Sequence, residues 1–136
     1  MIRVDDLEKF MGGPTPAHRT VPHVSINKVN VIMLNKVAYD KLGKPDSVFL
    51  HYSRSKSMIV IEPAHSSRMP GAFPVKQQTP VNWRINAAPF CRNYGIHVES
   101  TERFINADIL HDDRQLVLRL TETVTVKQIR KRKKAQ

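Results

Sequence analysis

The sequence predicts a mainly β domain with short helices, built from two consecutive units of strand, helix and hairpin. Apolar residues alternate with a period of two in several short stretches, which is typical of strands with one buried face. Two short helical stretches each end at a glycine, and the whole order of elements occurs twice along the chain. With 136 residues, 40% hydrophobic and 25% charged, the chain is long enough for one core but short for two independent domains.

Residues 1–23 are expected to be an appendage to this domain. Asp5 and Glu8 fit a capping pattern for a short helix over residues 3–11. The stretch that follows holds two glycines and three prolines, which interrupt helices and strands, so we expect a linker there. The N-terminus lacks the cationic start and apolar middle of a secretory signal, and we therefore expect an unexported, cytoplasmic protein.

The first expected unit spans residues 24–63. A β-rich run over residues 29–34 leads to Asn35, which is a good helix N-cap, and a two-turn helix is expected to follow and to end at Gly43. Two alternating apolar stretches on either side of a polar turn then predict a hairpin over residues 48–62.

The second expected unit spans residues 82–121 and has the same order of elements. A strand is expected to end at Ile85, where Asn86 is the expected N-cap of a helix that ends at Gly95. Alternating apolar stretches around a polar turn again predict a hairpin, over residues 104–120. Because a unit this short cannot bury both its faces alone, the two units are expected to pack together.

Two further segments lie outside the units. Residues 64–81 form an inter-repeat loop in this prediction, because several prolines and Gly71 interrupt every regular element. Residues 122–136 form a basic tail, in which the run from Lys127 to Lys134 repels itself, has nothing apolar beyond Ile129 to bury and is expected to be a mobile arm. A polyanion is the natural partner of such a tail.

The first unit resembles the AbrB-type swapped-hairpin family, in the stretches VIMLNKVAYDKLG (31–43), PDSVFL (45–50) and MIVIEP (58–63). That family's unit has a strand, a short helix ending in a Leu-Gly pair, and a closing hairpin. The MraZ-like division-cluster regulators of the same SpoVT/AbrB-like superfamily carry two such units in one chain of about this length. The resemblance is closer over residues 29–63 than over residues 82–120.

This resemblance implies a pseudo-symmetric swapped-hairpin β-barrel of the cradle-loop type. Members of the family are mostly transcriptional regulators and antitoxins that bind DNA, and they usually place an arginine in the strand before the helix. The first unit has no arginine there, whereas the second has Arg84. The resemblance therefore supports the fold more directly than it supports DNA binding.

The formal net charge of +10 indicates a polyanion as partner. The expected contacts of the domain flank the strand-to-helix joint of both units and are Lys28, Lys36, Arg84 and Arg92. The tail is expected to neutralise backbone phosphates without specifying sequence. Its expected contacts are Lys127, Arg130, Lys131, Arg132, Lys133 and Lys134.

The sequence predicts no catalytic, metal or cofactor site. The six histidines lack the spacing of zinc ligands, and Cys91 is the only cysteine, so we expect it to be a small buried residue. Asp112 and Asp113 are adjacent in a turn, where their side chains diverge, and Gly12-Gly13 lacks the lysine of a phosphate-binding loop. No apolar run approaches the ~18 residues of a membrane span. We therefore expect a non-enzymatic protein without a small-molecule substrate or membrane partner.

The sequence favours a DNA-binding transcriptional regulator of the AbrB-like type, with RNA as a second polyanion. The aromatic residues are expected mainly to pack in the core, and Trp83 is the best candidate for exposure and base stacking. The alternative is a homo-oligomeric interaction module that assembles through exposed strand edges and whose tail binds RNA or an acidic protein. The nucleic-acid site, the oligomeric state, the pathway, the role of the N-terminal segment and the pairing of units within or between chains stay open.

Overall fold

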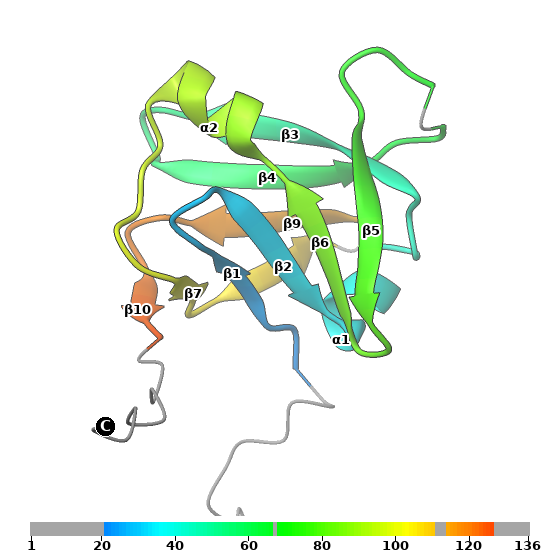
Figure 1. The fold of residues 1–136 in the computed structure, drawn as a ribbon, viewed down its shortest axis with the longest axis horizontal. Helices are drawn as coiled ribbons and strands as arrows, with labels where there is room; N and C mark the ends of the chain where they lie inside the picture. Colours follow the sequence, from blue (N-terminus) through cyan, green and yellow to red (C-terminus); the bar gives the residue numbers. More distant parts are fainter. Residues whose placement is uncertain (1–20, 67, 111–113, 127–136) are drawn as a thin grey trace, which may run out of the picture.

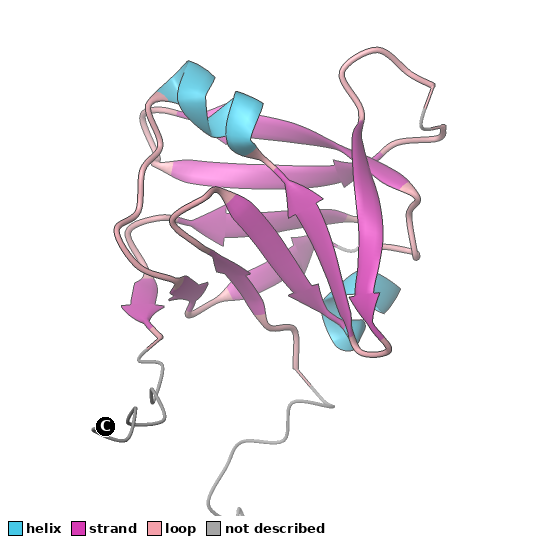
Figure 2. Cartoon of the chain, viewed as in Figure 1, coloured by secondary structure: helices cyan, strands magenta, loops and turns pink. Residues whose placement is uncertain are grey.

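The computed structural model describes residues 21–66, 68–110 and 114–126. These residues form a mainly antiparallel β structure with two short helices, as Figure 2 shows. The expected helix at residues 3–11, the turn aspartates Asp112 and Asp113, and the cations of the basic tail lie outside the described residues.

Among the described residues, the first half of the chain forms four strands and one helix. In order they are β1 (Val24–Ile26), β2 (Val31–Asn35), α1 (Lys36–Lys41), β3 (Ser47–Ser53) and β4 (Met58–Pro63). The second half forms six strands and one helix. These are β5 (Phe73–Thr79), β6 (Asn82–Asn86), α2 (Ala88–Tyr94), β7 (Glu102–Phe104), β8 (Ala107–Leu110), β9 (Gln115–Arg119) and β10 (Thr123–Thr125).

The strands pair in the order β10-β7-β1-β2-β6-β5-β3-β4-β9-β8, and every neighbouring pair is antiparallel. The expected closed barrel is therefore wrong, because β10 and β8 are the end strands of an open sheet. Only Ile105 and Asn106 separate β8, one end strand, from β7, which is the neighbour of the other end strand β10. In Figure 1, β3, β4 and β9 run at a steep angle to β2, β6 and β5.

The expected inter-repeat loop at residues 64–81 is also wrong in part, because β5 occupies Phe73–Thr79. A proline is tolerated near the start of a strand, and Pro74 is the second residue of β5, opposite Ser47. The ladder resumes at once, since the Val75 amide donates to the Asp46 carbonyl at 2.9 Å.

Both helices begin and end close to the expected residues, but their caps differ. The Asn35 side chain accepts a hydrogen bond from the Ala38 amide at 3.0 Å, which confirms it as the N-cap of α1. Asn86 is not the N-cap of α2; that position is Ala87, which makes no side-chain cap bond. Gly95 ends α2 in the left-handed conformation with φ of 67°, as expected.

One core contains residues from both halves and from both helices. Its largest fully buried side chains are Ile26, Ile32, Leu34, Leu42, Ile59, Ile61, Ile85, Leu116 and Leu118. The strands alternate buried and less buried positions, so one face of each strand packs on this core and the other faces outward. In Figure 1, α2 lies at the upper left of the molecule and α1 at the lower right.

Corresponding hairpins of the two halves have the same register. Val24 of β1 lies opposite Leu34 of β2, and Val75 of β5 lies opposite Ile85 of β6, so both partners shift by 51 residues (75 minus 24, 85 minus 34).

The other two hairpins match in the same way. Ser53 lies opposite Met58 in the β3–β4 hairpin, and Leu110 lies opposite Gln115 in the β8–β9 hairpin, so both partners shift by 57 residues (110 minus 53, 115 minus 58).

Candidate nucleic-acid interface

A row of three cations crosses the outer face of five neighbouring strands. Register places Arg103 of β7 opposite Ser25 of β1, Ser25 opposite Met33 of β2, Met33 opposite Arg84 of β6, and Arg84 opposite Lys76 of β5. Residues directly opposite one another in an antiparallel pair lie on the same face of the sheet. We call these five residues the basic row.

The basic row faces away from the core. Each of its members on β7, β1, β2 and β6 is next in sequence to a buried residue, and side chains alternate between the two faces of a strand. Those buried neighbours are Phe104, Val24, Ile26, Ile32, Leu34, Trp83 and Ile85. Arg84 and Lys76 are exposed, and Arg103 is half-buried.

The three cations of the basic row have no counter-charge among the described residues. None of them forms an ion pair or a side-chain hydrogen bond with another described residue. Glu102 is the only acidic residue within the described strands β10, β7, β1, β2, β6 and β5, and its neighbour Arg103 lies on the opposite face. The Glu102 carboxylate accepts hydrogen bonds from the Thr123 and Thr125 hydroxyls, at 2.9 and 2.7 Å.

Charges on the other four strands are paired instead. The Arg119 guanidinium lies 2.8 Å from the Asp108 carboxylate, and this hydrogen bond raises the pKa of Arg119. His51 lies 3.1 Å from Glu62 across the β3–β4 pair. The electropositive strand surface of the described chain is therefore on the side of the basic row.

The structure does not bring the predicted contacts of the domain together into one site. Arg84 lies in the basic row, but Lys28 is in the β1–β2 turn and Lys36 follows the opposite end of β2. Lys36 is also paired with Asp40, 3.1 Å away and one helical turn further on. Arg92 is exposed in the last turn of α2.

Lys76 and Arg103 belong to the basic row but are absent from the predicted contacts. Lys76 lies in β5, which is not predicted from the sequence because prolines interrupt the segment. Arg103 lies just before Phe104, at which the second hairpin is expected to begin. Alternation of side chains within each strand indicates that they face outward. Their alignment with Arg84 depends on the strand order, which local sequence does not reveal.

Trp83 is buried, with 9% of its surface exposed, so the expectation that it is the best exposed aromatic residue is wrong. Its indole stacks on the Tyr39 ring at 4.1 Å between ring centroids and 8° between planes. Burial, with smaller contributions from Asp46 and Asp40, raises the pKa of the Tyr39 phenol. In the described basic row no aromatic side chain is available for base stacking.

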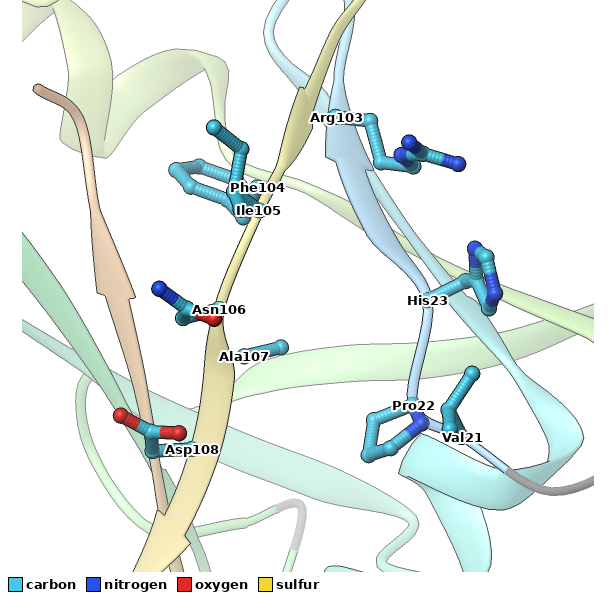
Figure 3. Close-up of a pocket in the computed structure, with 9 residues that line it drawn as sticks. All are labelled: Val21, Pro22, His23, Arg103, Phe104, Ile105, Asn106, Ala107 and Asp108. Atoms are coloured by element: carbon cyan, nitrogen blue, oxygen red, sulfur yellow. The ribbon is translucent and has the colours of Figure 1, made fainter. Parts of the chain in front are cut away.

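A surface pocket of about 380 Å³ lies beside one end of the basic row. Figure 3 shows the side chains of Val21, Pro22, His23 and Arg103 on one side of this pocket and those of residues 104–108 on the other. Apolar and polar groups are mixed in its lining, and Asp108 is already paired with Arg119. The pocket therefore offers no cluster of free charges for a ligand.

The described residues contain no group of three or more His, Cys, Asp or Glu side chains placed to hold a metal ion. Cys91 is buried on α2, and burial raises the pKa of its thiol to about 11, so it is a poor nucleophile at neutral pH. Within the same described ranges, neither helix has the length and apolar character needed to cross a membrane.

Comparison of the chain with models of protein families, with curated proteins and with solved structures finds no match. The fold and the basic row are therefore the features of the molecule that bear on its function.

Proposed function

We propose that this protein binds duplex DNA through the outer face of β7, β1, β2, β6 and β5. The observation that carries this proposal is the alignment of Arg103, Arg84 and Lys76 in one outward row without counter-charges among the described residues. Cations that neutralise phosphates release condensed counterions, and this release supplies much of the affinity of proteins for DNA.

The length of the basic row fits a groove of the double helix. Neighbouring strands are about 4.8 Å apart, so the four steps from Lys76 to Arg103 span about 19 Å. The major groove of DNA is about 12 Å wide, with a phosphate backbone on each side. Lys76 and Arg103 can therefore reach the two backbones while the centre of the row faces the groove.

Duplex DNA suits this surface better than a single strand. Proteins that bind single-stranded nucleic acid combine cations with aromatic side chains on which the bases stack. The central positions of the basic row are Ser25, Met33 and Arg84, and Trp83 beside them points into the core. The row provides charge without a stacking platform.

We further propose that the chain consists of two AbrB-like swapped-hairpin units and acts as a transcriptional regulator. The shared registers of the hairpins support two copies of one unit. Met33 and Arg84 lie opposite each other and are also 51 residues apart (84 minus 33), as a local two-fold axis between the copies requires. Two further predictions come from the sequence alone, namely that the protein is cytoplasmic and that it is not an enzyme.

Fluorescence anisotropy with a labelled random-sequence duplex, measured across a salt series, tests DNA binding by this face. The variant Lys76→Gln, Arg84→Gln, Arg103→Gln removes three cations from the basic row. We expect its plot of log affinity against log salt concentration to be flatter by about 2.7, because each lost phosphate contact contributes about 0.9 to the slope.

A control variant removes the same charge elsewhere. Arg54, Lys56 and Arg68 are exposed in the β3–β4 turn and in the segment before β5, and none lies in the basic row. Changing these three to Gln should alter the slope by less than about one phosphate contact. Equal losses in both variants would contradict binding by this face.

A further inference from the structure

β10 is one of the two end strands of the sheet, and its outer side has no partner among the described strands. The edge is firmly held on its inner side. Thr123 and Thr125 lie opposite Phe104 and Glu102 of β7, and the Val126 amide donates to the Thr101 carbonyl at 2.8 Å. β10 therefore presents an ordered row of backbone donors and acceptors to a further strand.

The sequence of this edge does nothing to prevent pairing. Residues 123–126 are Thr-Val-Thr-Val, all β-branched, and Val124 and Val126 are 39% and 41% exposed. Edge strands are normally protected by a charged residue, a proline or a covering segment. Residues 123–126 have neither a charge nor a proline.

The other end strand, β8, differs from β10 because it carries a charge and has another segment of the chain near it. It carries Asp108, which is held in an ion pair with Arg119. Residues 21–23 face it across the pocket shown in Figure 3. Of the two end strands in the described part of the chain, β10 is the one suited to pair with another strand.

We propose that β10 pairs with β10 of a second copy of this chain, antiparallel and centred on Thr125. The stretch Val124-Thr125-Val126 is self-complementary in this register, because Val124 of each copy lies opposite Val126 of the other. Val124 is opposite Arg103 and so lies on the outer face, where the two valine pairs cover one another. An interface of this kind is isologous, as in most homodimers.

The dimer doubles the proposed DNA-binding surface. Antiparallel pairing of two identical edges places the two-fold axis perpendicular to the sheet, so both basic rows face the same side. This consequence rests on the proposed function, whereas the dimer itself does not. A dimer measured without DNA therefore succeeds or fails independently of DNA binding.

Sedimentation velocity of the full chain over a range of concentrations, after nuclease treatment, tests the dimer. We expect a species of twice the chain mass. Val124→Lys should raise the dissociation constant of this dimer at least about tenfold, because a lysine on an edge strand disfavours pairing with a further strand. Val81→Lys is the matched control, because Val81 is 55% exposed in the β5–β6 turn. It should leave the dissociation constant unchanged.

Cross-linking provides a second measurement that does not depend on a destabilising change. Under mild oxidation Thr125→Cys should form a disulfide between two copies, whereas Thr121→Cys, also exposed, should not. The native Cys91 is buried and does not compete. A chain that stays monomeric, or a dimer that Val124→Lys and Val81→Lys affect alike, overturns the proposal.

Discussion

In the first half of the fold the helix α1 begins at Asn35, whose side chain caps it, whereas in the second half α2 begins at Ala87, which has no capping side chain. The backbones nevertheless match. Ser57 and Arg114 precede β4 and β9, and they have similar positive φ angles, 50° and 52°. The halves therefore share hairpin registers and the turn conformation before β4 and β9, while their polar side chains differ.

The difference continues on the surface. Met33 and Arg84 occupy matching outward positions on β2 and β6, and only the second of them is charged. Matching backbones require the same core positions and the same left-handed turns, but they place no such demand on outward side chains. We infer that charge on this fold is free to be concentrated on one side, as it is in the basic row.

Substitutions at core positions should cause the largest losses of stability, and the losses should be similar in the two halves. Ile32 and Ile85 lie opposite each other in the β2–β6 pair, and neither is exposed. We expect Ile32→Ala and Ile85→Ala each to lower the free energy of unfolding by about 2–5 kcal/mol, because each leaves a cavity. Equilibrium urea unfolding measures both. A small loss of stability in one half and a large loss in the other would contradict the equivalence of the two core positions.

Removing the asparagine side chain at the start of each helix should lower stability by different amounts in the two halves. The Asn35 Oδ1 accepts from the amides of Ala38 and His23, both at 3.0 Å, and its Nδ2 donates to the Val21 carbonyl at 2.9 Å. Asn35→Ala should therefore cost about 2 kcal/mol. Within the described residues, the side chain of the exposed Asn86 accepts a single hydrogen bond, from the Ala88 amide at 3.3 Å, and Asn86→Ala should cost less than about 0.5 kcal/mol. Thermal unfolding that ranks them in reverse would contradict the assigned caps.

The two glycines after the helices should differ less. Gly43 and Gly95 both have positive φ, so an alanine at either position is strained by about 1 kcal/mol. At Gly43 the added Cβ also meets the Arg114 guanidinium, whereas at Gly95 it meets nothing. We expect Gly43→Ala to be the more destabilising in urea unfolding. Adding Arg114→Ala should remove the difference.

The effect of Cys91 on stability should depend on pH. Burial raises the pKa of its thiol from 9.0 to about 11, so between these values the thiol ionises in the unfolded chain but not in the folded one. Its contribution to stability is complete below about pH 9 and is lost as the pH rises toward 11. The stability difference between wild type and Cys91→Ala should therefore shrink over this window. A difference that does not change with pH would contradict this burial.

Much of the first half could be predicted from the sequence because its signals are local. Asn35 and Gly43 delimit α1, and period-two patterns mark β3 and β4. Four strands were missed wholly or for the most part, among them β7, of which only Phe104 lies in the predicted hairpin. β5 contains Pro74, and β1 and β10 have only three residues each, which is too short for a periodic pattern to be seen.

The candidate site was less predictable than the fold. Arg84 could be singled out next to a predicted helix, but Lys76 and Arg103 join it only through pairings between strands that are distant in sequence. Whether a sheet stays open or closes into a barrel depends on the same pairings between strands that are distant in sequence. Local patterns determine which face a residue occupies, and the strand order determines its neighbours on that face.

The most direct test of the central claim uses a chain that ends at residue 126 and so keeps β10 and the basic row but lacks the basic tail. Its affinity for duplex DNA should be measured by fluorescence anisotropy across a salt series. We predict that binding persists with a clear negative salt slope, which Lys76→Gln, Arg84→Gln, Arg103→Gln then flattens. Complete loss of binding on removing residues 127–136 would contradict a DNA-binding sheet face.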